Sequence, residues 1–156
     1  MASAFARLPQ VRAVALFGSV ARPLEIRITR RGWEMLRHCK DVDLAVWIDP
    51  PHDLAALNQA RSRAVGCLVK EANVGVAHHQ VDVFLFEPGS DRYLGRLCTF
   101  GSCPKGRWEC ATPGCGREPL LRQHEAFVFD PEALAEDRIV RLYEKVSRRG
   151  ERQGLG

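Results

Sequence analysis

The sequence has no long apolar run, no internal repeat and no low-complexity tract. A membrane-spanning helix needs about 20 consecutive apolar residues, and no stretch approaches that length, so we expect no membrane span. The apolar stretch at residues 13–17 is too short for a signal peptide and is more typical of a strand. We therefore expect a cytoplasmic protein with no membrane partner.

The chain also lacks the length for a second full domain and lacks a strong excess of one charge. Its 156 residues fit one ordinary domain, which we assign to residues 1–156. The net charge of +4 favours an anionic partner such as a nucleotide or nucleic acid, and surface solubility explains it equally well. With 46% hydrophobic and 27% charged residues, the chain has the composition of a globular protein with its own core.

Strand and helix patterns alternate along most of the sequence. Short apolar segments predict strands at 11–17, 41–48 and 80–86, and a strand or hairpin arm at 120–129. Apolar residues at every third or fourth position predict a helix over 53–72, with Asp49 or Asp53 as its N-cap. We also expect a helical turn within 2–9, a short helix at 31–38 and a final helix from Pro131 to about Arg148. This alternation predicts an α/β fold, a small mixed β-sheet with flanking helices.

Three aspartates lie in or beside these predicted strands. Asp41 and Asp43 are two positions apart, so a strand places both side chains on one face. Asp82 lies in the third apolar strand, and the three carboxylates converge if the two strands are neighbours. Adjacent carboxylates repel each other unless a cation lies between them, and Mg²⁺ takes oxygen ligands while leaving positions for phosphate. Three acids can hold two such ions for in-line attack at phosphorus, whereas solvated acids at strand ends are the plain alternative.

A glycine–serine pair follows the first predicted strand. Gly18 allows the backbone to approach a ligand closely, and free N–H groups after it can hold a phosphate. Ser19 adds a hydroxyl donor. Taken alone, such a pair is more often an ordinary turn that ends a strand.

Taken together, these residues resemble the nucleotidyltransferase superfamily that includes DNA polymerase beta, in particular its small stand-alone members. The likeness covers residues 10–87 and is carried by three segments in order, at 16–22, 41–44 and 81–83. The resemblance implies a nucleotidyltransferase fold and a metal-dependent enzyme that uses ATP or another nucleoside triphosphate (NTP).

The same resemblance implies a role for each matching residue. Gly18, Ser19 and Arg22 would bind the triphosphate. Asp41 and Asp43 would hold two Mg²⁺ ions, and the third aspartate would complete the second metal site and help to activate an acceptor hydroxyl. A nucleoside monophosphate would pass to a protein, an RNA or a small molecule, with release of pyrophosphate.

The segment between the glycine–serine pair and the first aspartate departs from the family pattern. Residues 20–40 are 21 positions, longer than the family has, and they are basic. The extra residues form an insertion that leaves the site intact, or they move Ser19 out of reach. Their arginines either contact phosphate or an acceptor, or form a solvated surface. This segment favours a second hypothesis, a non-catalytic or antitoxin-like module that binds nucleic acid or a protein partner such as a toxin.

Four of the six cysteines gather in one short stretch, at Cys98, Cys103, Cys110 and Cys115. Each of the two pairs brackets a short turn that contains glycine, and four thiolates from two turns suit one tetrahedral, structural Zn²⁺. We predict a zinc-binding insert at about 96–118, with disulfides as the main alternative. Basic and aromatic residues in the insert, Arg96 among them, either contact a nucleic-acid acceptor or form the surface of the loop.

Overall fold

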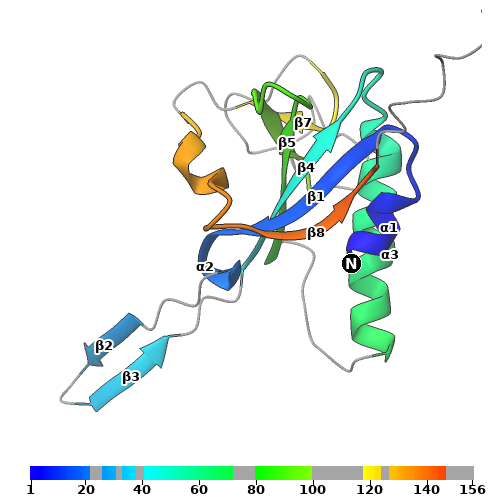
Figure 1. Ribbon diagram of the computed structural model, residues 1–156. Helices are drawn as coiled ribbons and strands as arrows, with labels where there is room; N and C mark the ends of the chain where they lie inside the picture. Colours follow the sequence, from blue (N-terminus) through cyan, green and yellow to red (C-terminus); the bar gives the residue numbers. More distant parts are fainter. Residues whose placement is uncertain are drawn as a thin grey trace, which may run out of the picture.

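A six-stranded mixed sheet forms the centre of the molecule, and a two-stranded hairpin lies apart from it (Figure 1). The computed structural model describes residues 1–21, 26–30, 33–37, 41–71, 80–99, 118–123 and 127–146. Helices flank the sheet, so the predicted mixed α/β class is confirmed.

The elements follow one another along the chain as α1 (Ala2–Ala6), β1 (Val11–Phe17), α2 (Gly18–Ala21), β2 (Ile26–Arg30), β3 (Trp33–Arg37), β4 (Val42–Ile48), α3 (Leu54–Glu71), β5 (Val81–Phe86), β6 (Tyr93–Leu97), β7 (Leu121–Arg122), the 3-10 helix η2 (Pro131–Leu134) and β8 (Val140–Glu144). The three predicted strands at 11–17, 41–48 and 80–86 correspond to β1, β4 and β5, and the predicted helix at 53–72 corresponds to α3.

The strand order in the large sheet is β7-β6-β5-β4-β1-β8. Strands β4 and β5 run parallel, because α3 lies in the crossover between them and returns the chain to the same end of the sheet. The other neighbouring pairs are antiparallel. Since β4 and β5 are central and parallel, their N-terminal ends meet at one edge of the sheet.

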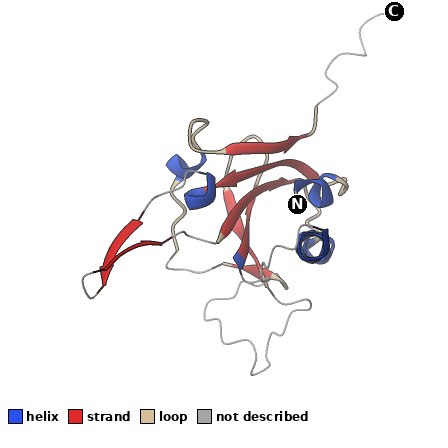
Figure 2. Ribbon diagram, turned by 90° about the horizontal axis from the view of Figure 1, so that it is seen from below, coloured by secondary structure: helices blue, strands red, loops and turns tan. Residues whose placement is uncertain are grey.

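Side chains alternate between two buried layers on the two faces of the sheet. Helices α1 and α3 cover one face, and η2 lies on the other side (Figures 1 and 2). The helix-covered layer includes Leu44, Val46 and Ile48 of β4, as the alternation in the sequence predicts. The opposite layer is largely aromatic, with Phe17, Trp47, Phe84, Phe86 and, packed against them, Phe129. Phe86 and Phe129 meet edge to face at 4.9 Å between ring centres, a favoured geometry for aromatic pairs.

Helix α3 begins at an aspartate cap. The carboxylate of Asp53 accepts the backbone N–H of Ala56 at 2.9 Å, so the second of the two predicted N-caps is the one used. Among the described residues, no helix is both long enough and apolar enough to cross a membrane.

The expected helix at 31–38 is wrong. Residues 33–37 form β3, which pairs with β2 in an antiparallel hairpin whose register joins Arg30 to Trp33. A connection of only two residues leaves no room for a helix that starts at Arg31. Isoleucine, threonine and tryptophan are enriched in strands, and the segment holds all three, at Ile26, Ile28, Thr29 and Trp33.

The expected helix from Pro131 to about Arg148 is also wrong beyond its first turn. Asp130 caps η2 by accepting the N–H of Glu132 at 3.0 Å, but η2 ends at Leu134. The chain then forms β8, which pairs with β1. Strand β1 lies inside the sheet and needs hydrogen-bond partners on both sides, and β8 supplies the second set. Within the described parts of the strand predicted at 120–129, which are 120–123 and 127–129, only β7 is a strand, and β6 was not predicted.

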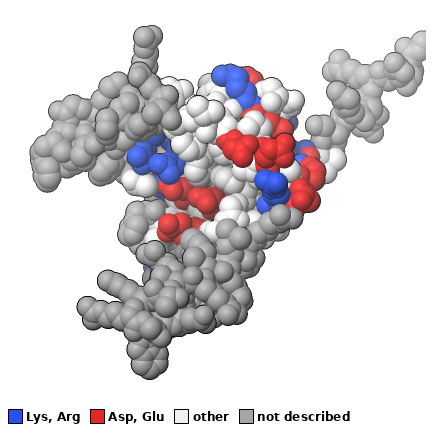
Figure 3. Space-filling view, turned by 90° about the vertical axis from the view of Figure 1, so that its left-hand side faces the viewer, with Lys and Arg blue, Asp and Glu red and all other residues white. Residues whose placement is uncertain are grey.

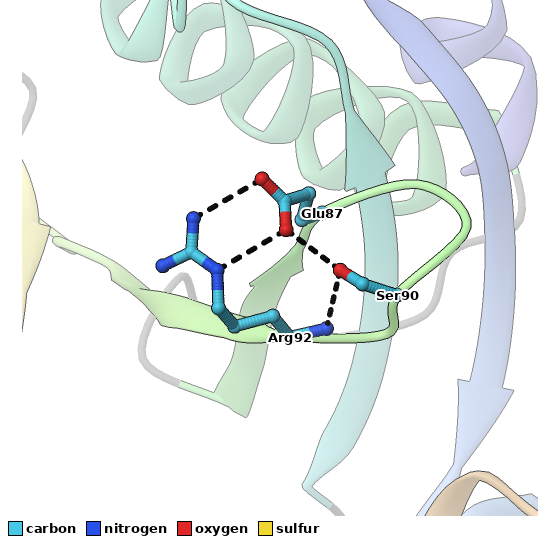
Figure 4. A network of polar contacts seen from close by, with 3 residues as sticks. All are labelled: Glu87, Ser90 and Arg92. Carbon is cyan, nitrogen blue, oxygen red and sulfur yellow. Dashed lines mark hydrogen bonds and ion pairs between the residues drawn. The ribbon is translucent and has the colours of Figure 1, made fainter.

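A network of polar contacts closes the turn between β5 and β6 (Figure 4). Arg92 donates two hydrogen bonds to Glu87, each at 3.1 Å, and the hydroxyl of Ser90 donates a third at 2.6 Å. Bonds from Arg92 and Ser90 lower the pKa of Glu87 to about 2. These bonds connect the end of β5 to the start of β6. In the register of the two strands, Arg96 lies opposite Phe84.

Candidate active site

Two of the three predicted acids face each other across neighbouring parallel strands. Asp43 of β4 is paired in register with Asp82 of β5, and both lie near the N-terminal ends of their strands. Neighbouring strands are about 4.8 Å apart, and paired residues point to the same face. Both side chains are partly buried. Asp41 lies just before β4 and is exposed, so it belongs to the same edge but not to the strand.

The pKa of Asp43 lies well above its ordinary value. Burial is the main cause, the negative charges of Asp82 and Asp41 add to it, and Arg96 acts in the opposite direction. The result is a pKa of about 6 for Asp43. Burial and the two neighbouring acids therefore both disfavour the ionised form of this carboxyl.

Gly18 brings the backbone against the Asp43 carboxylate. Strand β1 pairs Phe17 with Asp43, and Gly18 follows at the start of α2 with a φ of +72°. A Cβ atom added to Gly18 would lie 2.6 Å from Oδ2 of Asp43, closer than real Cβ contacts. Ser19 follows in α2 and is partly buried, whereas Arg22 lies outside the described residues. The structure thus places Gly18 beside Asp43.

Arg96 supplies the positive charge at this edge. Its Nη1 donates to Oδ2 of Asp82 at 2.9 Å, and its guanidinium carbon lies 5.5 Å from the centre of the Phe84 ring. On the side of the molecule that carries α2 and η2, acidic side chains lie in groups with Lys and Arg side chains beside them (Figure 3). Sequence reasoning placed Arg96 in the zinc insert, because β6 was not predicted.

The described residues contain no group of three His, Cys, Asp or Glu side chains close enough to hold a metal ion. The three aspartates are therefore near one edge without forming a ready-made metal site. Of the four predicted zinc ligands, only Cys98 is described, and it is a buried free thiol. Cys103, Cys110 and Cys115 lie outside the described residues.

Both ends of the cysteine-rich segment are attached near Asp82. The N–H of Cys98 donates to the carbonyl of Leu120 at 2.7 Å, and β6 pairs Leu97 with Leu121. Extending the β5–β6 register by two residues places the Cys98 backbone at the level of Asp82. The first residues of the predicted insert at 96–118 therefore lie in β6, where Arg96 pairs with Asp82.

A buried arginine of α3 holds the start of this segment from the helix side. Arg61 is 1% exposed and donates to the carbonyl of Thr99 at 2.9 Å and to Asn58. Among the described residues its Nε and Nη1 have no hydrogen-bond partner, and burial lowers its pKa. The helical pattern in the sequence gave no signal for this residue, because an arginine in a helix is usually exposed.

Comparisons of the chain with protein-family models, with curated proteins and with solved structures found no match.

Proposed function

We propose that this protein is a metal-dependent nucleotidyltransferase that transfers a nucleoside monophosphate from an NTP to a hydroxyl acceptor. One observation carries the proposal. Asp43 and Asp82 face each other on parallel strands, and Gly18 places the backbone against the first of them. The resemblance to the nucleotidyltransferase superfamily implies metal binding for both of these aspartates and triphosphate binding for Gly18.

The chemistry of the acids suits Mg²⁺. Their ligand atoms are carboxylate oxygens, which Mg²⁺ prefers. Burial first, and then the neighbouring acids, raise the pKa of Asp43, and a cation beside it would favour its ionised form. Asp41, Asp43 and Asp82 would hold the ions, which supply positive charge for the phosphoryl oxygens. Gly18 and Ser19 would position the triphosphate, and Asp82 would orient the acceptor hydroxyl and take up its proton.

Calorimetric titration with each NTP, in Mg²⁺ and then in EDTA, tests this proposal. We expect Mg²⁺-dependent binding that is lost in the Asp41→Asn/Asp43→Asn double variant. Asp53→Asn is the matched control, because it also removes a carboxylate and asparagine caps a helix as well as aspartate does. If no NTP binds to the wild-type protein, or if the double variant binds as well as the control, the proposal is wrong.

A non-catalytic binding module is the second candidate. The ion pair between Arg96 and Asp82 favours it, since a neutralised acid is less ready to bind a metal. In that case the protein would bind a nucleic acid or a toxin-like protein partner without turnover, and the same titration would give no Mg²⁺-dependent NTP binding.

A further inference from the structure

Arg96 is held against the acid pair by three contacts. Its backbone pairs with Phe84, two residues beyond Asp82 in β5. Its guanidinium carbon lies 5.5 Å from the centre of the Phe84 ring, and Nη1 donates to Asp82 at 2.9 Å. The strand register and the ring already order the side chain, so the ion pair costs less conformational entropy than one between free surface chains.

The guanidinium of Arg96 is already bound to the Asp82 carboxylate, which a metal ion between the two acids would also need as a ligand. Oδ2 of Asp82 accepts its hydrogen bond, and the same positive charge opposes the increase in the pKa of Asp43. One side chain therefore partly neutralises both facing acids. A divalent ion that enters between them must compete with Arg96.

Arg96 is also accessible to an anion from solvent. Its side chain is 32% exposed and that of Asp82 is 24% exposed, so the ion pair lies at the surface of the site. Guanidinium groups bind phosphate oxygens with two parallel hydrogen bonds. A phosphate placed beside the acids would therefore attract the same side chain that now holds Asp82.

We infer that Arg96 is a positioning residue that keeps a divalent cation from the space between Asp43 and Asp82 until an anionic substrate draws the guanidinium away. The identity of that substrate as a nucleoside triphosphate rests on the proposed function. The competition between Arg96 and the metal does not depend on it.

The test measures binding of Mn²⁺ alone, by the electron paramagnetic resonance signal of the free ion. We expect Arg96→Gln to bind Mn²⁺ about fivefold more tightly than the wild-type protein, which is the effect of an ion pair worth about 1 kcal/mol. Arg92→Gln is the matched control for net charge, because Arg92 is paired with Glu87 in the adjacent turn. It should bind Mn²⁺ as the wild-type protein does.

A second pair of variants separates the ion pair from a general effect of charge. In an Asp82→Asn background, Arg96→Gln should change Mn²⁺ affinity much less than in the wild-type background, because the ion pair is gone and only the effect of Arg96 on Asp43 remains. Thermal melting establishes that all variants are folded. Equal Mn²⁺ affinity in wild-type and Arg96→Gln proteins, or an Arg96→Gln effect of undiminished size without Asp82, would overturn the inference.

The titration is then repeated with the α,β-methylene analogue of ATP. We expect the analogue to tighten Mn²⁺ binding in the wild-type protein and to reduce its difference from Arg96→Gln. If the analogue has no effect on any variant while Arg96→Gln still binds Mn²⁺ more tightly, the release by substrate and the proposed function fail, and the competition between Arg96 and the metal stands.

Discussion

Asp43 is a residue whose surroundings oppose its own charge. Burial and two neighbouring acids disfavour its charged form. A group whose pKa rises on folding stabilises the protein only while it is protonated, and this contribution is lost as the pH increases through the folded pKa. The ionised carboxylate therefore lowers the stability of the metal-free protein at neutral pH.

We predict that Asp43→Asn is more stable than the wild-type protein in EDTA at pH 8. The raised pKa corresponds to about 3 kcal/mol at most, and because the side chain is only half-buried we expect about 1 kcal/mol. The difference should shrink as the pH falls through 6 and be lost below the ordinary value of 3.8, where the wild-type carboxyl is protonated in both states. Melting temperatures across this pH range measure it. A variant that is less stable at pH 8 would contradict the origin of the shift.

The acids of the site could be predicted from the sequence, and their counter-ion could not. Asp43 and Asp82 are isolated charges in apolar strands, which is a local signal. The pairing of Arg96 with Asp82 depends on β6, a strand of five residues with glycine in its middle. Glycine weakens a strand pattern, so the element and its arginine were both missed.

Among the elements, the junction of β1 and α2 determines how closely the backbone approaches the acids. Gly18 has a positive φ, and its Cα hydrogen points at the place where a side chain would meet the Asp43 carboxylate. A side chain at this position would be strained by the positive φ and would displace the Asp43 carboxylate.

We predict that Gly18→Ala lowers the free energy of unfolding by more than Gly89→Ala. Both glycines have positive φ, so each alanine costs about 1–2 kcal/mol of backbone strain, but an added Cβ at Gly89 has no atom within 4 Å. The contact with Asp43 should add at least about 1 kcal/mol at Gly18. Denaturant unfolding measures both variants. The extra loss should disappear in an Asp43→Ala background, and its persistence there would mean that another contact is responsible.

Helices and strands with a clear pattern in their own residues could be predicted from the sequence. A strand that forms only because it pairs with a segment far away in the chain could not. The capped, amphipathic α3 and the apolar β1, β4 and β5 have clear patterns in the sequence. Strand β8 has helix-forming neighbours and few buried side chains. It is a strand because β1, more than a hundred residues earlier, needs a second partner, and a local pattern cannot contain that information.

At the scale of the whole molecule, the described start of the cysteine-rich segment, Cys98, directly follows β6, the strand that carries Arg96. Cys98 is buried, and Leu120 and Arg61 hold the backbone at and just after it in place from two sides. The sequence predicted the segment and its zinc ion, but it contained no information about where the segment joins the sheet. That position follows from the β5–β6 and β6–β7 pairings.

We predict that the purified protein contains one zinc ion per chain and that Cys98→Ser loses it and melts at a lower temperature. A structural zinc site stabilises a segment that has little core of its own. Cys67→Ser is the control, since Cys67 is an exposed cysteine on α3 outside the predicted ligand set. Metal analysis and thermal melting measure the effect. Zinc content that is equal in the two variants would show that the ligand set is wrong.

The turn between β5 and β6 has a consequence for which changes in chain length the site tolerates. Side chains alternate along a strand, so inserting or deleting one residue in this turn would shift the register by one and reverse the faces of β6. Gly95 or Leu97 would then lie on the side of the acids, and Arg96 would point into the apolar layer beneath α3. A change of two residues would preserve the face. Whether the number of residues inserted into or deleted from this turn is odd or even therefore decides whether Arg96 stays beside the acids, although the turn contacts neither acid.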